Sequence, residues 1–180
     1  MEYPVKFFLL GLLLIPSTLF SQRKEEELLA WSDSRKLTWA DYKGNPDAES
    51  DAAASTTSYL AIDYNIRSTS FSYKIESRFS KTRSWGLHQT DYILRHEQGH
   101  FDIAEVFARK LHKKMSEYKF NRRTYQKDLK KIYDEVTQEK EEIQNSYDEE
   151  TNHSINKKKQ AEWLGRIEEM LEEYEEYADY

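Results

Sequence analysis

One stretch of this 180-residue sequence decides its fold: Leu94-Arg95-His96-Glu97-Gln98-Gly99-His100-Phe101-Asp102-Ile103-Ala104-Glu105. It belongs to a longer segment in which apolar residues recur every three or four positions between residues 92 and 118. That period predicts an α-helix from about Thr90 to Tyr118, with Thr90 as the N-cap. His96 and His100 are four residues apart within the apolar stripe, so they project from one face on adjacent turns.

The spacing of His96 and His100 suits a zinc ion, because imidazole nitrogens on adjacent turns can close on one metal at about 2.0–2.1 Å. Glu97 lies about 100° around the helix from His96, beside this face, where its carboxylate can reach a zinc-bound water. We therefore predict that His96 and His100 bind zinc and that Glu97 is catalytic. Gly99 costs helix stability, up to about 1 kcal/mol relative to Ala, so we expect a backbone or a substrate to approach it closely.

Two more helices are predicted downstream. A second apolar stripe indicates a helix from about Thr124 to Tyr147, and a third stripe, from Gln160 to Tyr177, follows a polar loop over residues 148–156. The outer face of the third helix is rich in glutamate, which we interpret as a solvated surface.

A zinc site needs a third protein ligand. If the second helix folds back antiparallel on the first, residues 142–148 lie level with the two histidines, and the following loop is next to the metal. His153 in that loop is our first choice, because a loop histidine can approach the open tetrahedral position. Asp148 and Glu139 remain alternatives. Glu139 is in phase with an apolar seam, which suits a carboxylate that meets a metal or a cation.

Two nearby side chains each have two interpretations from the sequence. Tyr147 is predicted to turn its hydroxyl toward a developing oxyanion, although packing explains a tyrosine at this phase equally well. Asp102 is a candidate for orienting a ligand imidazole, but its angle on the helix favours an ordinary surface position.

Upstream of this helix the period changes to two. Residues 55–80 predict two strands, one near Leu60 to Tyr64 and a clearer one from Phe71 to Phe79, paired antiparallel. We expect the second strand to be an edge strand able to align an extended peptide. The predicted fold is α+β and zincin-like: a small, mainly antiparallel sheet packed on the long HExxH helix, with two further long helices. It occupies one domain, 37–180, with a strand-rich half (37–89) and a helical half (90–180).

The N-terminus has the order of a secretory signal peptide over residues 1–21: Lys6, then an apolar run at 7–15, then Pro16 and small polar residues. The run is shorter than the roughly 20 residues that span a bilayer, so we expect no retained membrane anchor. Residues 22–36 are a charged lead, expected to be frayed as far as about Ala30. The protein is predicted to be secreted or periplasmic.

Composition excludes several classes of function. The chain contains no cysteine, so it has no disulfide and no thiol nucleophile, and any metal chemistry must come from His, Asp and Glu. Its 33 acidic residues outnumber 27 basic ones for a net charge of -6, which argues against a nucleic-acid partner.

Several segments together resemble the family catalogued as domain of unknown function 922, which is described as predicted secreted zinc-dependent proteases. They are Leu37-Thr38-Trp39-Ala40-Asp41-Tyr42-Lys43-Gly44, Leu94 through Glu105, Tyr147-Asp148, Thr151-Asn152-His153, Gln160 and Trp163. The resemblance implies a zincin-like metallopeptidase in which His96 and His100 bind zinc and Glu97 is catalytic. The motif that contains His153 fits a ligand role for it. Ser154 departs from the pattern, in which we expect glycine.

The function expected from the sequence is zinc-dependent hydrolysis of protein or peptide substrates. One zinc ion activates a water molecule, and Glu97 acts as the general base. A secreted binding or interaction module, stabilised by zinc but without catalysis, is the alternative. A helical interaction protein without any metal is a third possibility.

Overall fold

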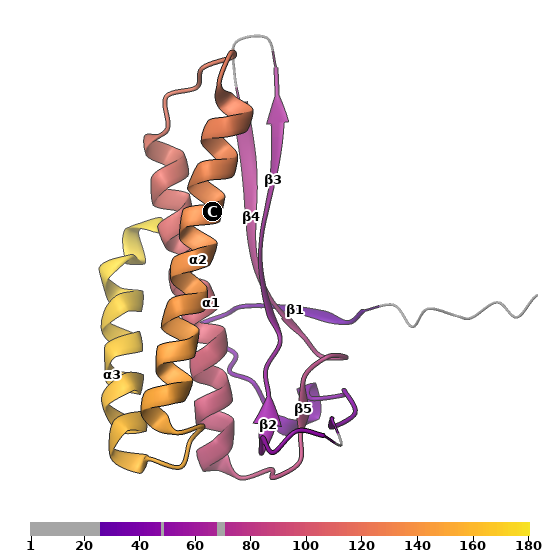
Figure 1. Cartoon of the computed structure of the whole chain (residues 1–180). Coiled ribbons are helices and arrows are strands. Elements are labelled where there is room, and N and C mark those ends of the chain that lie inside the picture. The colour runs from indigo at the N-terminus through magenta and orange to yellow at the C-terminus, as the bar shows by residue number, and fades with distance from the viewer. Residues whose placement is uncertain (1–25, 48, 68–70) are drawn as a thin grey trace, which may run out of the picture.

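A small antiparallel sheet and three long helices make up an α+β fold (Figure 1), as the computed structural model shows for residues 26–47, 49–67 and 71–180. The predicted fold class is confirmed at this level. The signal peptide predicted over residues 1–21 lies outside the described residues. Within the described part of the chain, none of the helices combines the length and apolar character that crossing a membrane requires.

The main sheet is built on a long hairpin. β3 (Ser58–Ile66) and β4 (Phe71–Ser80) pair antiparallel, with Ile62 opposite Ile75, as the period of two predicted. The strand order is β1-β4-β3, so β4 is the central strand. Our expectation that the strand from Phe71 to Phe79 forms an edge is therefore wrong, because β3 covers one side of it and β1 covers the end of the other.

The charged lead also differs from expectation. Its residues Leu28–Ala30 form β1, which pairs antiparallel with residues 78–80 of β4, instead of being frayed. Leu29 is partly buried against the cluster that contains Phe79 and Phe101. A short segment within the charged lead thus becomes a strand because a partner edge from elsewhere in the chain satisfies its backbone groups.

Two short strands and a helical turn complete the strand-rich half. β2 (Ala54–Ser55) pairs antiparallel with β5 (Trp85–Gly86) as a separate two-stranded sheet. Trp39–Asp41 form a 3-10 turn, η1. β5 leads into the first long helix, so these elements lie at the start of the helical half (Figure 1).

The long helix α1 (Asp91–Glu117) starts where the sequence predicts. The Thr90 hydroxyl accepts a hydrogen bond from the amide of Ile93 at 3.2 Å and caps the helix. α1 contacts β3 and β4 as well as α2 (Tyr125–Thr151) and α3 (Lys157–Glu173), so it lies at the centre of the fold (Figure 1). A 3-10 turn, η2 (Glu175–Tyr177), follows α3 and also contacts α1.

α2 runs one turn further than the sequence predicts. It ends at Thr151 instead of Tyr147, because Thr151 is fully buried and Asn152, with φ of 48°, provides a left-handed C-cap. Asp148 is therefore a helical residue and not part of a loop. This extension fixes the direction of its carboxylate relative to α1.

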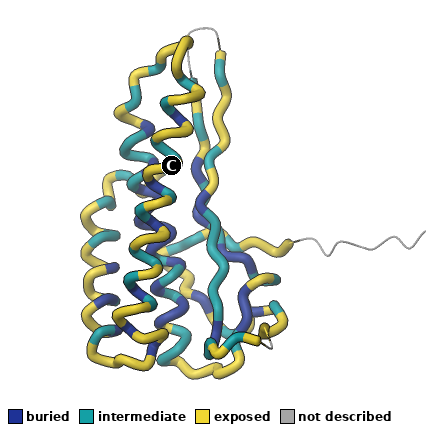
Figure 2. The backbone as a smooth tube through the Cα atoms, viewed as in Figure 1, coloured by how far each residue is buried: buried dark blue, intermediate teal, exposed yellow. Residues whose placement is uncertain are grey.

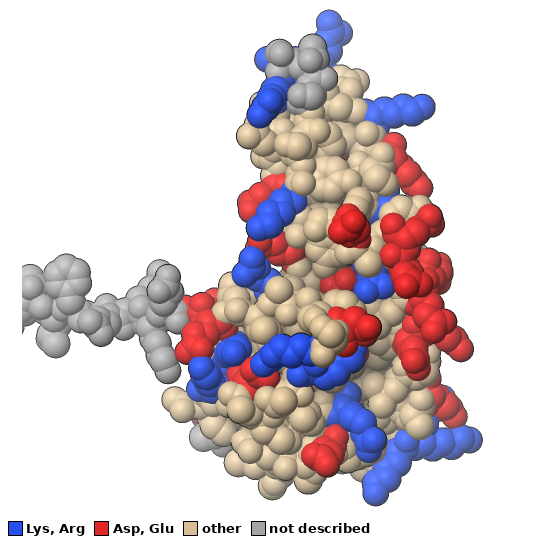
Figure 3. All heavy atoms as spheres, turned by 180° about the vertical axis from the view of Figure 1, so that it is seen from behind, with Lys and Arg blue, Asp and Glu red and all other residues tan. Residues whose placement is uncertain are grey.

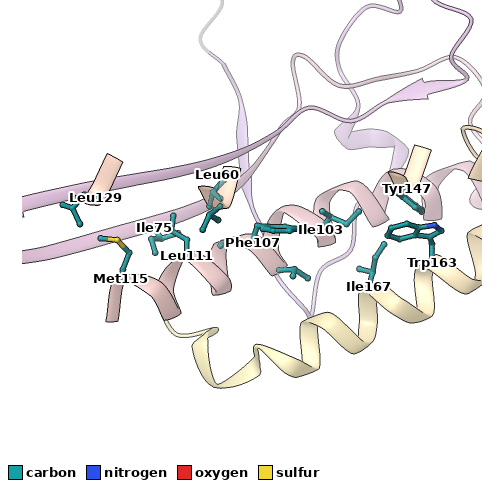
Figure 4. Packing of buried hydrophobic residues seen from close by; sticks show 13 residues of the cluster. Leu60, Ile75, Ile103, Phe107, Leu111, Met115, Leu129, Tyr147, Trp163 and Ile167 are labelled. Carbon is teal, nitrogen blue, oxygen red and sulfur yellow. The ribbon is translucent and has the colours of Figure 1, made fainter. Parts of the chain in front are cut away.

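The hydrophobic core lies between the sheet and α1 and continues between α1 and α3 (Figure 4). Buried segments face one another across these layers, while outer faces are exposed (Figure 2). Among the core residues are Leu60, Ile75, Ile103, Phe107, Leu111, Trp163 and Ile167. The acidic side chains of α3 are exposed, as predicted, and acidic groups gather along one side of the molecule (Figure 3).

Candidate metal centre

Three side chains from two helices bring their ligand atoms together. Asp148 Oδ1 lies 3.1 Å from Nε2 of His96 and 3.1 Å from Nε2 of His100, and the two Nε2 atoms are 3.3 Å apart. A tetrahedral zinc ion with bonds of about 2.0–2.1 Å holds its ligand atoms roughly 3.3 Å apart. The three atoms are thus spaced as the ligands of one zinc ion would be, and these residues could hold a metal.

The helix geometry explains how this cluster forms. His96 and His100 occupy adjacent turns of α1, and α2 returns antiparallel beside them. The prediction that residues 142–148 lie level with the histidines is confirmed by the contacts of Gln144 and Asp148 with His100. Asp148 contributes its carboxylate from the last turn of α2, which the predicted helix end would have placed in a loop.

The electrostatics of the cluster favour positive charge. Burial disfavours the charged form of His100, but hydrogen bonding to Asp148 and the charge of Glu97 outweigh it and raise the His100 pKa to about 9. Burial likewise acts against an ionised Asp148, yet its hydrogen bonds to His100 and His96 hold its pKa well below the usual range. The carboxylates that favour protonation of His100 would also favour a bound cation.

Glu97 lies beside the cluster with an unsatisfied carboxylate. The residue is 4% exposed, and among the described residues its Oε2 has no hydrogen-bond partner. Buried carboxylate oxygens normally have a partner, because an unpaired one costs free energy. The unpaired oxygen therefore marks a position where a polar group from outside the chain can bind.

A cleft of about 590 Å³ opens over the cluster. Its residues come from α1, from α2 and from the segment that includes β2, and among them are His96, Glu97, His100, Asp148, His153, Trp85 and residues 52–58. The cluster and Glu97 are thus accessible from this cleft, although both histidines have little exposed surface.

His153 lies at the edge of the same cleft. Its side chain is 67% exposed, and its Nδ1 is 3.6 Å from Asp148 Oδ1, so it is close to the cluster without being part of the triad. Asn152, His153 and Ser154 all have positive φ, at 48°, 49° and 72°. The glycine expected in place of Ser154 has a physical reason, because the left-handed region favours glycine.

Tyr147 is placed inside the fold. It is fully buried, its ring stacks on His96 with centroids 4.5 Å apart, and its hydroxyl donates to the backbone carbonyl of His96 at 3.2 Å. Burial raises the pKa of Tyr147, so the hydroxyl remains a donor. Packing, one of the two interpretations from the sequence, accounts for these contacts, while the oxyanion contact stays a prediction.

Gly99 has the close neighbour that the sequence predicts, but of a different kind. A Cβ on Gly99 would lie 2.6 Å from the hydroxyl oxygen of Tyr147. The approaching group is therefore a side chain of α2, and not a backbone or a substrate. Glycine at this position lets α2 come close enough to α1 for Asp148 to meet the histidines.

The other candidates from the sequence lie elsewhere. Glu139 forms an ion pair with Lys110 of α1, so the carboxylate in the apolar seam meets a cation and is not in the metal cluster. Asp102 accepts hydrogen bonds from Trp31 Nε1 at 2.7 Å and from Gln98 Nε2 at 2.8 Å. It is therefore engaged away from His96 and His100, and does not orient either imidazole.

Gln144 was not among the residues predicted from the sequence. This residue hydrogen-bonds His100 from α2, and it lies four residues before Asp148, on the same face of the helix. Both residues belong to the window 142–148 that helix geometry places beside the histidines. The signal for Gln144 in the sequence is its spacing of four residues from Asp148, which was already a candidate.

Fold and site together define an α+β protein in which a HExxH helix and the helix after it form one candidate metal centre. The chain belongs to the family described as bacterial protein of unknown function (DUF922), which matches residues 30–154. This range includes every residue of the cluster as well as His153. Comparisons with curated proteins and with solved structures give no match.

Proposed function

We propose that the protein is a secreted or periplasmic zinc-dependent metallopeptidase. The observation that carries this proposal is the spacing of three ligand atoms at 3.1–3.3 Å beside an unpaired, buried carboxylate of Glu97. A purely packed helix seam does not need two imidazoles and two carboxylates around one point, because each buried polar group costs free energy unless it is paired.

His96, His100 and Asp148 would hold the ion, with two neutral nitrogens and one carboxylate oxygen as ligands. A bound zinc ion supplies a Lewis acid and lowers the pKa of a coordinated water toward about 7. Asp148 is ionised at neutral pH, since its pKa lies below the usual range. Three protein ligands leave a fourth position on the side of the cleft, as catalytic zinc sites require.

Glu97 would act as the general base. Its unpaired Oε2 accepts a proton from the attacking water, and the same carboxyl group then gives this proton to the leaving amine. His96, which would hold the metal, is the residue next to Glu97 on α1. The general base would therefore lie beside the metal-bound water, which is the nucleophile. His153, at the edge of the cleft, is available to donate an N–H to the developing oxyanion. From the sequence, this role was predicted for the hydroxyl of Tyr147.

The segment around β2 is suited to bind an extended peptide. The backbone carbonyls of Ala53 and Thr57 accept hydrogen bonds from neighbouring segments of the sheets. Because successive residues of a strand alternate in direction, we infer that the backbone groups of Ala54 in β2 point to the opposite edge. Ala54 lines the cleft, so β-addition is proposed here instead of on β4. Peptides N-methylated beside the scissile bond should be cleaved at least tenfold more slowly, and equal cleavage would exclude this alignment.

The experiment that tests the proposed function compares Glu97→Gln with the parent protein on a peptide library, with zinc content measured for both. We expect one zinc per chain in each protein and a loss of hydrolysis of about 10²–10⁴-fold in the variant. Zinc below about 0.2 per chain after metal-replete expression would refute zinc binding. Equal cleavage by variant and parent would refute the role of Glu97.

A zinc-stabilised binding module without catalysis is a second candidate function. The observation that favours it is the 3.6 Å distance from His153 Nδ1 to Asp148 Oδ1, because a fourth protein ligand would close the coordination sphere. X-ray absorption on the zinc-loaded protein separates the two candidates. Two histidine nitrogens with additional oxygen ligands support the peptidase, and three histidine nitrogens with Asp148 support the closed site.

A further inference from the structure

Gln144 makes two hydrogen bonds to a single residue, His100. Its Oε1 lies 2.5 Å from the ring Nδ1 of His100, and its Nε2 donates to the backbone carbonyl of His100 at 2.9 Å. One amide group thus holds both the ring and the backbone of the same residue. Gln144 projects from α2, one turn before Asp148.

The chemistry of these contacts fixes the proton positions. A backbone carbonyl only accepts hydrogen bonds, so the NH₂ group of Gln144 must face it, and the amide oxygen must face the ring. That oxygen also only accepts, so the Nδ1 atom of His100 must carry a hydrogen. In the neutral ring the lone pair then lies on Nε2, which is the atom that faces His96 and Asp148.

We propose that Gln144 is a positioning residue for the metal centre: it selects the Nδ1–H tautomer of His100 and aims Nε2 at the ion. This inference rests on the proposed zinc binding. A histidine ligand usually donates its second ring N–H to an oxygen that fixes its orientation. Here the oxygen belongs to a neutral amide, which adds no negative charge behind the ligand.

His96 is held differently, which makes the effect of Gln144 specific to one ligand. Among the described residues, the buried Nδ1 of His96 has no hydrogen-bond partner, and its ring rests on the stacked ring of Tyr147. Outside the Nε2 contacts of the cluster, stacking therefore holds the ring of His96, whereas a hydrogen bond to Nδ1 also sets the tautomer of His100. Loss of the Gln144 amide should alter the chemical state of His100 and leave His96 unchanged.

The first test measures zinc affinity by competition with a chelator in the parent chain and in Gln144→Leu. Gln138→Leu is the matched control, because Gln138 is an exposed residue of the same helix that bonds Glu142. We expect binding to weaken by about 10–100-fold in Gln144→Leu and to be unchanged in the control. Unchanged affinity in Gln144→Leu would overturn the proposal.

The second test reports on the proton directly, and its first measurement uses the parent protein alone. Nitrogen-15 NMR of histidine-labelled, zinc-loaded parent protein should show a protonated Nδ1 and a metal-bound Nε2 for His100. A metal-bound Nδ1 would overturn the proposal, whatever the variant does to folding. In Gln144→Leu the Nδ1 proton of His100 should exchange faster with water, and that of His96 should not.

These results differ from those expected if the proposed function fails. A parent protein that binds no zinc refutes the metallopeptidase. A parent that binds zinc with the same affinity as Gln144→Leu refutes only the role of Gln144.

Discussion

The two sides of α1 both carry buried or half-buried polar groups, yet these groups meet different partners. The side away from the cleft carries Gln98, Asp102, Glu105 and Arg109, and the side toward the cleft carries His96, Glu97 and His100. Both sets lie in or beside the apolar stripe of this helix.

On the side away from the cleft, the polar groups are paired with other parts of the chain. Glu105 accepts from Arg109 Nε at 3.0 Å and from the Tyr180 hydroxyl at 2.6 Å. Gln98 accepts from the amide of Leu37 at 2.7 Å and donates to Asp102. These bonds tie the segment before η1 and the C-terminal end to α1, so this side holds the fold together.

On the cleft side, pairing is incomplete. Oε2 of Glu97 and Nδ1 of His96 lack hydrogen-bond partners among the described residues, and the carboxylate of Asp148 contacts both histidines at once. Polar burial alone therefore does not identify a functional site. At this cluster, the unsatisfied Oε2 of Glu97 lies beside three closely spaced metal-ligating atoms, and this combination distinguishes the cleft side.

The largest effect that would sharpen this comparison is expected from removing a proposed metal ligand. Asp148→Ala should weaken zinc binding by more than about 100-fold. This exceeds the usual effect of removing a residue that only hydrogen-bonds a metal ligand. His153→Ala should keep zinc affinity close to that of the parent if Asp148 is the third ligand. Chelator competition on both variants decides between them, and the reverse result would restore His153 as the ligand.

On the opposite side of the helix, Glu105→Ala should act on stability and not on the metal. Removing one partner of a buried ion pair leaves Arg109 uncompensated, so we expect a loss of about 3 kcal/mol in the free energy of unfolding. Urea denaturation measures this loss, and zinc per folded chain should stay at one. A variant of normal stability, or one that loses zinc while folded, would break the division between the two sides.

Gly99 lies where α1 and α2 meet, so a substitution there should affect both the stability of the fold and zinc binding. In Gly99→Ala the new methyl group meets the Tyr147 hydroxyl, and we expect a loss of about 1–3 kcal/mol together with weaker zinc binding. Gly165→Ala is the control, because no atom lies within 4 Å of a Cβ there. It should stabilise α3 by up to about 1 kcal/mol and leave zinc binding unchanged. Similar unfolding curves for the two variants would contradict the close approach.

Asp41 is a fully paired carboxylate. We expect its protonation to have the smallest effect, a loss of stability that occurs only at acidic pH. Burial acts to raise its pKa, but hydrogen bonds from Arg35, Thr38 and Lys81 outweigh it and lower the pKa to about 2. Because the folded pKa lies below the ordinary value of 3.8, this stabilisation is complete above about pH 4 and is lost as pH falls toward 2.

The measurement for Asp41 is the unfolding free energy of the parent and of Asp41→Asn between pH 2 and pH 6. The difference between the two proteins should be constant above about pH 4 and shrink below it. A difference that does not change with pH would show that the charge of Asp41 contributes nothing to the fold.

The periodic patterns of the sequence predicted the long elements, β3, β4, α1, α2 and α3, and not the short ones. The two strands, the start of α1 at Thr90 and the pairing of His96 with His100 on one face depend on nearest neighbours along the chain. Such local geometry follows from the fixed period of each element. β1 and the extra turn of α2 were not predictable in this way, because distant partners stabilise them.

By itself, the sequence determined which residues can carry metal chemistry and that two of them share a helix face. Only the tertiary structure decided that Asp148 is a carboxylate beside them, that Glu139 meets Lys110 instead, and that Gln144 hydrogen-bonds His100. The physical reason is that helical spacing fixes angles within one helix, whereas contacts between helices depend on how closely they pack. In this protein Gly99 and Tyr147 set that approach.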